Sequence, residues 1–137
     1  MNSEFHISTD KSKLDIELIH SFLVNQSYWA KNRSLETVKK SIENSLCFGL
    51  YLEDKQIGFG RVATDFAVFA WILDVFIVKD YRGKGLSKKL MESILKYDGL
   101  QNIQRWGLAT KDAHGLYEQF GFHKCLTPEI FMEKLSE

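Results

Sequence analysis

The chain has 137 residues, of which 45% are hydrophobic and 26% charged, as in ordinary water-soluble globular proteins. That length predicts one domain, residues 1–137, large enough to bury a core. The 18 Lys and Arg residues balance the 18 Asp and Glu residues, which excludes a general preference for nucleic acid or acidic membranes. No apolar run approaches the roughly 18 residues of a membrane helix, and the N-terminus is unlike a signal peptide. We therefore expect a cytoplasmic protein.

A metal site is not predicted. The two cysteines, Cys47 and Cys125, lie far apart in the sequence, and neither C-x-x-C nor H-E-x-x-H occurs. Both thiols are expected to be free and buried.

The first third of the chain predicts one strand and two helices. Phe5–Thr9 alternates apolar and polar residues, as a strand does. Apolar residues at helical spacing then predict a helix over Leu14–Asn25 and a second helix, N-capped by Ser34, that runs to about Asn44. The loop between the helices, Asn25–Arg33, contains two large aromatic residues.

The middle of the chain reads as a run of strands followed by a helix. Leu46–Glu53 and Gln56–Thr64 predict a hairpin with a tight turn between them. A longer apolar run, Phe66–Val78, predicts a third strand, and the apolar stripe in Lys84–Tyr97 predicts a helix.

The last third predicts a strand at Arg105–Ala109 and a helix at Ala113–Phe120, with Asp112 as its N-cap and Gly121 as its stop. Two final strands are expected at Phe122–Cys125 and Ile130–Lys134. The predicted order is therefore β-α-α-β-β-β-α-β-α-β-β, with about seven strands.

The turn between the third long strand and its helix carries the strongest chemical signal. Gly83 and Gly85 allow positive φ and close approach of a ligand to the backbone. Four cations lie in this turn and the first helical turn, where the helix dipole disfavours them, and an anionic ligand would reverse that effect: Arg82, Lys84, Lys88 and Lys89. The alternative is a solvated basic surface turn.

Two common phosphate loops do not fit this turn. A Walker A loop requires Lys and then Ser or Thr after the last glycine, where Leu86 and Ser87 stand. The dinucleotide fingerprint requires a third glycine where Lys88 stands.

Two motifs resemble the GNAT superfamily of acyl-CoA-dependent N-acyltransferases. Arg82-Gly-Lys-Gly85-Leu-Ser87 is similar to the family's Q/R-x-x-G-x-G/A, with Ser87 in place of the usual final Gly or Ala. The segment Leu108–Phe122 resembles N-x-x-A-x-x-L-Y-x-x-x-G-F, with Thr110 where the family often has Asn. The predicted element order also resembles a complete GNAT domain.

The resemblance implies an α/β (α+β) fold with a mixed, mostly antiparallel twisted sheet and helices on both faces. It also implies acetyl-CoA as the acyl donor, bound in a cleft where two parallel strands diverge. The residues implied to bind it are Phe76, Ile77, Val78, Arg82, Gly83, Lys84, Gly85, Leu86, Ser87, Thr110 and Tyr117.

The resemblance implies a catalytic role for Tyr117, and the chemistry of the residues themselves suggests two candidate bases. Tyr117 falls on the position that protonates the departing thiolate, although a packed core Tyr is the alternative. Asp74 lies within an apolar strand, where burial should raise its pKa; it is a base, a partner of the substrate amine, or a structurally paired acid. His114 is a second candidate base, against a surface or core role, and a water chain is a third.

The acceptor is expected to be a primary amine of a small molecule or peptide, held by Tyr28, Trp29, Arg33 and Phe69. A tryptophan that fills the core is the alternative for Trp29. Two other functions stay open, namely a CoA-binding GNAT module without catalysis and a phosphate-loop protein unrelated to CoA. No nucleic acid or membrane partner is expected, and the resemblance is compatible with a homodimer whose C-terminal strands pair or exchange.

Overall fold

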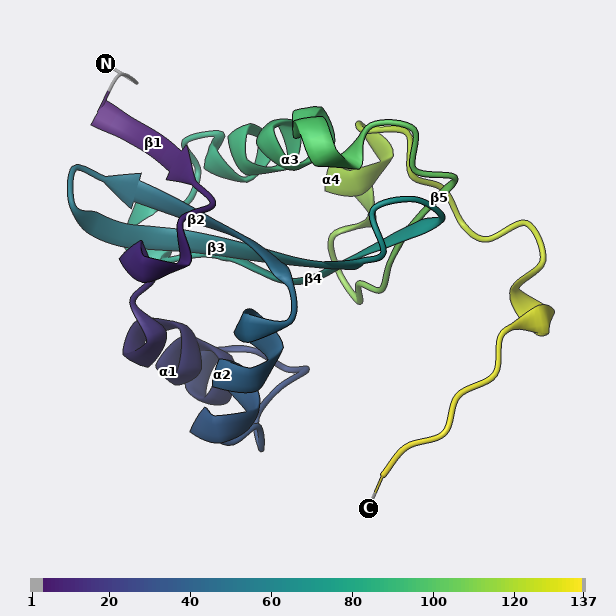
Figure 1. The fold of residues 1–137 in the computed structure, drawn as a ribbon, viewed down its shortest axis with the longest axis horizontal. Helices are drawn as coiled ribbons and strands as arrows, with labels where there is room; N and C mark the ends of the chain where they lie inside the picture. Colours follow the sequence, from purple (N-terminus) through teal and green to yellow (C-terminus); the bar gives the residue numbers. More distant parts are fainter. Residues whose placement is uncertain (1–3, 137) are drawn as a thin grey trace.

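A computed structural model describes residues 4–136 and contains a five-stranded sheet (Figure 1). The strands lie in chain order: β1 (Phe5–Ser8), β2 (Leu46–Leu52), β3 (Lys55–Thr64), β4 (Phe69–Ile77) and β5 (Arg105–Leu108). The first four pair antiparallel, and β5 pairs parallel to β4. The mixed, mostly antiparallel sheet is as predicted.

Helices cover both faces of the sheet, as predicted. On one face lie α1 (Ile16–Gln26) and α2 (Leu35–Glu43), and on the other lie α3 (Leu86–Lys96) and the short α4 (His114–Glu118) (Figure 1). Within residues 4–136, no helix has the length and apolar character needed to cross a membrane.

Each face has its own hydrophobic core. Under α1 and α2, Phe22 stacks on Phe76 with ring centroids 4.0 Å apart, and Phe59 packs beside them. Under α3, the fully buried Leu90 and Ile94 pack against the other side of the sheet. The sheet is therefore fixed from both sides, which holds β4 and β5 in place for the site described below.

The predicted cap of α2 is present. The Ser34 hydroxyl accepts a hydrogen bond of 3.1 Å from the backbone N–H of Thr37. Ser34→Ala is expected to lower the free energy of unfolding by about 1 kcal/mol, because an N–H at the helix start loses its partner. Urea denaturation measures this, with Ser34→Asp as the control that keeps a capping oxygen. Equal losses in the two variants would contradict the assignment.

The third long strand begins later than predicted. Instead of starting at Phe66, β4 starts at Phe69, because the Asp65 carboxylate accepts hydrogen bonds from the backbone N–H groups of Ala67, Val68 and Phe69. Those bonds hold a turn in which Phe66 has φ of 64°, so the segment cannot be extended.

The prediction of seven strands is wrong, because residues 4–136 contain five. Phe122–Cys125 and Ile130–Lys134 form no strand, and the only regular element there is a 3-10 turn at Pro128–Ile130. The turn's two backbone hydrogen bonds, from Ile130 to Thr127 and from Phe131 to Pro128, are local. A strand requires pairing along its length, and within residues 4–136 nothing pairs with this segment.

Candidate functional site

The site lies where β4 and β5 diverge. Their parallel pairing ends at Ile72 and Leu108, so the rest of β4 has an unpaired edge on the β5 side within the described residues. A cavity of about 690 Å³, here called the central cavity, opens at this point. Its lining is Tyr28, Trp29, Arg33, Ile72, Leu73, Asp74, Val75, Leu108, Ala109, Thr110, Lys111, Asp112, Ala113, Tyr117 and Leu135.

A β-bulge in β4 forms the floor of the central cavity. Asp74 and Val75 together lie opposite Gly60 of β3, and Asp74 has φ of 56°. Such a bulge bends the strand and re-aims a side chain. Here it places the Asp74 carboxylate, which is only 2% exposed, under the loop that joins α1 to α2.

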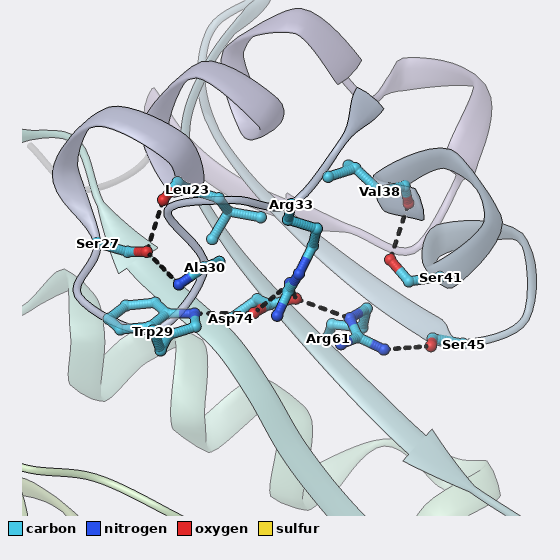
Figure 2. A network of polar contacts seen from close by, with 10 residues as sticks. All are labelled: Leu23, Ser27, Trp29, Ala30, Arg33, Val38, Ser41, Ser45, Arg61 and Asp74. Carbon is cyan, nitrogen blue, oxygen red and sulfur yellow. Dashed lines mark hydrogen bonds and ion pairs between the residues drawn. The ribbon is translucent and has the colours of Figure 1, made fainter. Parts of the chain in front are cut away.

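The Asp74 carboxylate is fully hydrogen-bonded (Figure 2). Its Oδ1 accepts from Trp29 Nε1 at 2.9 Å and from Arg33 Nη1 at 3.0 Å. Its Oδ2 accepts from Arg33 Nη1 at 2.8 Å and from Arg61 Nε at 2.9 Å. Since a carboxylate offers about four acceptor positions, no oxygen of Asp74 is left for another donor.

These contacts set the protonation state of Asp74. Burial raises its pKa, but the charges and hydrogen bonds of Arg61 and Arg33 outweigh burial and hold the pKa below its ordinary value of 3.8. The predicted rise in this pKa is therefore wrong. The geometry matches the third alternative, a structurally paired acid.

Sequence reasoning missed Arg61. Its Nη1 also donates to Ser45 Oγ at 3.0 Å, so it joins β3 and the end of α2 to the floor of the cavity. One feature of the sequence could have identified it. Arg61 is the single charged residue in the predicted strand Gln56–Thr64, which was expected to lie in the same sheet as Asp74. A buried cation requires an acidic partner, and Asp74 was the one acid in the neighbouring apolar run.

Three of the four predicted substrate residues are brought together. Tyr28, Trp29 and Arg33, all from the loop between α1 and α2, line the central cavity. The Tyr28 hydroxyl accepts a 2.7 Å hydrogen bond from the backbone N–H of Lys111, which ties this loop to the segment after β5. Phe69, in contrast, is exposed and outside the cavity, because it is the first residue of β4 and the cavity is lined by Ile72–Val75 further along the strand.

Tyr117 reaches the same cavity from the opposite wall. It belongs to α4, is 9% exposed, and packs edge-on against Phe122 with ring centroids 6.1 Å apart. Burial, followed by the nearby Tyr28 and Asp112, raises its pKa above the ordinary value of 10. The phenol is therefore protonated at neutral pH, as a proton donor must be.

The ends of α4 differ in part from the prediction. The N-cap position is Ala113, not Asp112, and the Ala113 backbone N–H donates to Thr110 Oγ1 at 3.1 Å. Gly121 follows the helix with φ of 92°, consistent with its predicted role as the stop. His114, at the first position of α4, is exposed and lines a neighbouring cavity of about 460 Å³ and not the central one.

The glycine turn has the predicted form. Gly83 and Gly85 have φ of 80° and 76°, Gly85 is the N-cap of α3, and a Cβ at either position would meet nothing within 4 Å. No acidic residue lies in the first turn of α3. A cavity of about 200 Å³, here called the turn cavity, is lined by Ile77, Tyr81, Arg82, Gly83, Gly85, Leu86, Ser87, Lys88 and Leu116.

Part of the Arg82 guanidinium stabilises the turn itself. Its Nε donates to the backbone oxygen of Ile77 at 2.9 Å, and its guanidinium lies 5.9 Å from the centre of the Phe22 ring. Arg82 therefore fixes the turn against the end of β4. No cluster of three or more His, Cys, Asp or Glu residues suited to a metal ion is found in residues 4–136.

The chain is similar to acetyltransferases in sequence and in structure. A family model described as an acetyltransferase (GNAT) domain matches residues 43–124. A crystal structure of a Xanthomonas campestris protein assigned to the GNAT family superposes with a TM-score of 0.94 at 45% identity, covering 96% of this chain and 93% of that chain.

Two less similar proteins are also described as acetyltransferases, the second as a probable one. The ycf52 protein of Gracilaria tenuistipitata var. liui, named as an uncharacterised N-acetyltransferase, is 34% identical over 102 residues, or 69% of this chain and 54% of that protein. A crystal structure of a Staphylococcus aureus protein of unknown function matches at 25% identity with a TM-score of 0.77, covering 97% of this chain and 99% of that chain.

Proposed function

The chain belongs to the GNAT family of acetyltransferases, and from this premise we propose that residues 1–137 act as one N-acetyltransferase domain. The proposed reaction transfers the acetyl group of acetyl-CoA to a primary amine of a small molecule or peptide. The amine attacks the thioester directly while both substrates are bound. Family membership supports acyl-CoA as the donor; the acetyl group and the amine acceptor are parts of the proposal.

The observation that carries this proposal is the open edge of β4, which connects the two cavities. Residues 72–75 of β4 line the central cavity, and Ile77 lines the turn cavity. An extended donor can therefore place its pyrophosphate at the glycine turn and its thioester beside Tyr117. Its amide groups would then lie along the edge of β4 that β5 leaves unpaired beyond Ile72, towards Phe76–Val78. Two backbone groups at that end are already occupied, because the Val78 N–H donates to the Ile57 oxygen and the Ile77 oxygen accepts from Arg82.

The glycine turn would hold the pyrophosphate of the donor. Backbone N–H groups over Gly83–Ser87 and the N-terminal end of α3 favour an anion. Lys84 and Lys88 add positive charge there, and Arg82 keeps the turn in place through its bond to Ile77. Thr110, at the rim of the central cavity, starts the segment that positions Tyr117.

In the proposed chemistry, a bond forms between the amine nitrogen and the carbonyl carbon, and the carbon–sulfur bond breaks. Tyr117 donates a proton to the departing thiolate, and the amine loses its proton to water. His114 lines the neighbouring cavity and not the central one. If His114 were the base, a chain of water molecules would have to carry the proton from the amine to its ring.

Asp74 has a positioning role in this proposal. Its oxygens are already hydrogen-bonded to Trp29, Arg33 and Arg61, so it neither takes the proton nor binds the ammonium group. It holds Trp29 and Arg33 at the wall of the central cavity, where the acceptor would bind beside Tyr28.

Release of free thiol from acetyl-CoA, measured across a panel of amines, tests the proposal. Amine-dependent thiol release and a product that is heavier by one acetyl group are expected. CoA binding without turnover on any amine would instead support the alternative of a catalytically inactive CoA-binding module.

A further inference from the structure

One edge of the Arg33 guanidinium has no partner among residues 4–136. Its Nη1 donates to both oxygens of Asp74, at 3.0 Å and 2.8 Å, while its Nε and Nη2 make no hydrogen bond there. The one buried side-chain polar atom without a partner in these residues is the Tyr51 hydroxyl, so both nitrogens of Arg33 keep contact with solvent. Because a guanidinium is a rigid planar fork, the N–H groups of Nε and Nη2 point the same way and form a second, unoccupied edge.

This free edge belongs to the central cavity. The Arg33 side chain is 21% exposed and lines the cavity, whereas Arg61 is 12% exposed, lies outside the lining and donates its Nη1 to Ser45. Figure 2 shows Arg33 reaching Asp74 from the loop between α1 and α2, with Trp29 and Arg61 on either side of the carboxylate. Of the two arginines, Arg33 is therefore the one whose remaining donors a ligand in the cavity can reach.

The cluster around Asp74 contains more positive than negative charge. Arg33 and Arg61 both pair with Asp74, and neither pairs with any other acidic residue of the described chain. The other charged residues of the cavity lining, Lys111 and Asp112, have opposite signs and are exposed to solvent. A partly buried cation without a full counter-charge is costly, and an anionic group bound at Arg33 would remove that cost.

The same charge decides which end of an acceptor faces Arg33. An ammonium group would be repelled by the two guanidinium groups, and the oxygens of Asp74 that could attract it are already hydrogen-bonded. Arg33 is therefore suited to an acidic group of the acceptor and not to its amine. The amine is left to the opposite wall of the cavity, where Tyr117 lies.

Two aromatic rings line the cavity together with Arg33. Tyr28 and Trp29 pack edge to face, with ring centroids 5.0 Å apart, and are 46% and 41% exposed. Both rings are held in place, Tyr28 by the N–H of Lys111 and Trp29 by its bond to Asp74. Exposed rings that are fixed at a cavity offer a surface for the apolar part of a ligand.

We propose that the acceptor amine carries an acidic group, a carboxylate or a phosphate monoester, that binds the free Nε–Nη2 edge of Arg33. Two parallel N–H groups match two oxygens of either group. This acid site rests on the acetyl transfer proposed above and narrows its acceptor to a compound with an amine at one end and an acid at the other. Neutral amines lack the contact with Arg33 and are poorer acceptors.

Thiol release from acetyl-CoA with paired acceptors tests the acid site. One set pairs glycine, β-alanine and γ-aminobutyrate with their primary amides, and a second set pairs phosphoethanolamine with ethanolamine. Rates are corrected for the fraction of each amine that is deprotonated. At least one acid is expected to exceed its neutral partner about tenfold or more in kcat/KM, as charge-assisted hydrogen bonds would give. A preference in the first set identifies a carboxylate, and a preference in the second identifies a phosphate.

Two variants separate the fork of Arg33 from its charge. Arg33→Lys keeps a cation beside Asp74 but loses the fork, so the acid-over-neutral ratio of kcat/KM is expected to fall about tenfold while the neutral partner changes by less than about twofold. Lys31→Gln, the matched control, removes a cation from the same loop outside the cavity and is expected to keep the ratio. If Arg33 were only structural, Arg33→Lys would lower both rates of a pair equally.

Different results would contradict acetyl transfer and the acid site. Equal kcat/KM for the acid and the neutral partner in every pair, or a wild-type ratio in a folded Arg33→Lys variant, would overturn the acid site and leave acetyl transfer in place. If Arg33→Lys did not fold, the wild-type pairs would decide. Absence of thiol release with every amine would contradict acetyl transfer to these acceptors. The thermal shift of the CoA-saturated chain would then decide about Arg33: stabilisation by an acid but not by its neutral partner supports the acid site, and no stabilisation by any acid overturns it.

Discussion

Replacing Asp74 by alanine is expected to lower the free energy of unfolding by about 3–5 kcal/mol, the largest effect of any single substitution discussed for this chain. The change removes the one carboxylate between Arg33 and Arg61, whose side chains are 21% and 12% exposed. It leaves two guanidinium groups close together with no counter-charge between them, and it also leaves Trp29 Nε1 without its acceptor.

Urea denaturation at neutral pH measures this loss. Asp112→Ala is the matched control, because Asp112 is an exposed carboxylate at the same cavity and its removal is expected to change the free energy by less than about 0.5 kcal/mol. Equal effects of the two substitutions would show that the Asp74 cluster does not hold the fold.

The pH dependence of stability gives a second readout for Asp74. Its pKa in the folded chain lies below the ordinary value of 3.8, so the unfolded chain binds protons first as the pH falls. The stabilisation from this group is therefore complete above about pH 5 and is lost as the pH falls through 3.8 and below. The Asp74→Asn variant is expected to lack this part of the acid-induced loss.

Tyr117→Phe is expected to reduce kcat by about 10² to 10⁴, because the departing thiolate loses its proton donor while the ring keeps its packing. The KM for the amine and the affinity for acetyl-CoA are expected to change little. Steady-state thiol release measures kcat and KM, and calorimetry measures the affinity.

Tyr97→Phe is the matched control for this prediction. It removes a tyrosine hydroxyl from a ring that packs against Phe48, outside the three cavities that surround Tyr117 and the glycine turn. If Tyr117→Phe retained the wild-type kcat, Tyr117 would be a packing residue only, and the proposed route of the proton would be wrong.

Short stretches of sequence were sufficient to predict the features of the structure that depend on local backbone conformation. The positive φ of Gly83 and Gly85 and the cap by Ser34 follow from residue types within a few positions of one another. The resemblance to the GNAT family predicted that Trp29 and Arg33 lie together on the acceptor side, and both line the central cavity. Their binding of an acceptor stays a prediction.

The protonation of Asp74 could not be predicted from its own segment. Burial alone raises a carboxyl pKa, and the sequence around Asp74 shows only burial. The two arginines that lower this pKa, Arg33 and Arg61, lie 41 and 13 residues away from Asp74. A β-bulge that the hydrophobic pattern does not predict turns the carboxylate towards them. The prediction of the last two strands failed for a similar reason, since Phe122–Cys125 and Ile130–Lys134 have the residue types of short strands but their sequences do not contain a strand partner.

A thermal-shift titration of the wild-type chain with acetyl-CoA, CoA and ATP tests whether the glycine turn and the open edge of β4 bind an acyl-CoA. Ligand at a hundredfold excess over its dissociation constant should stabilise the folded chain by about 2.7 kcal/mol. Gly85→Glu should remove the shift, because it places a carboxylate in the proposed pyrophosphate site. Gly121→Glu, the same change at another positive φ, should keep it.

A shift is expected with acetyl-CoA and CoA and none with ATP, and only Gly85→Glu is expected to lose the shift. If no acyl-CoA stabilised a well-folded wild-type chain, or if ATP stabilised it more than acetyl-CoA, the glycine turn would not be a CoA site, and the proposed reaction would be contradicted with it.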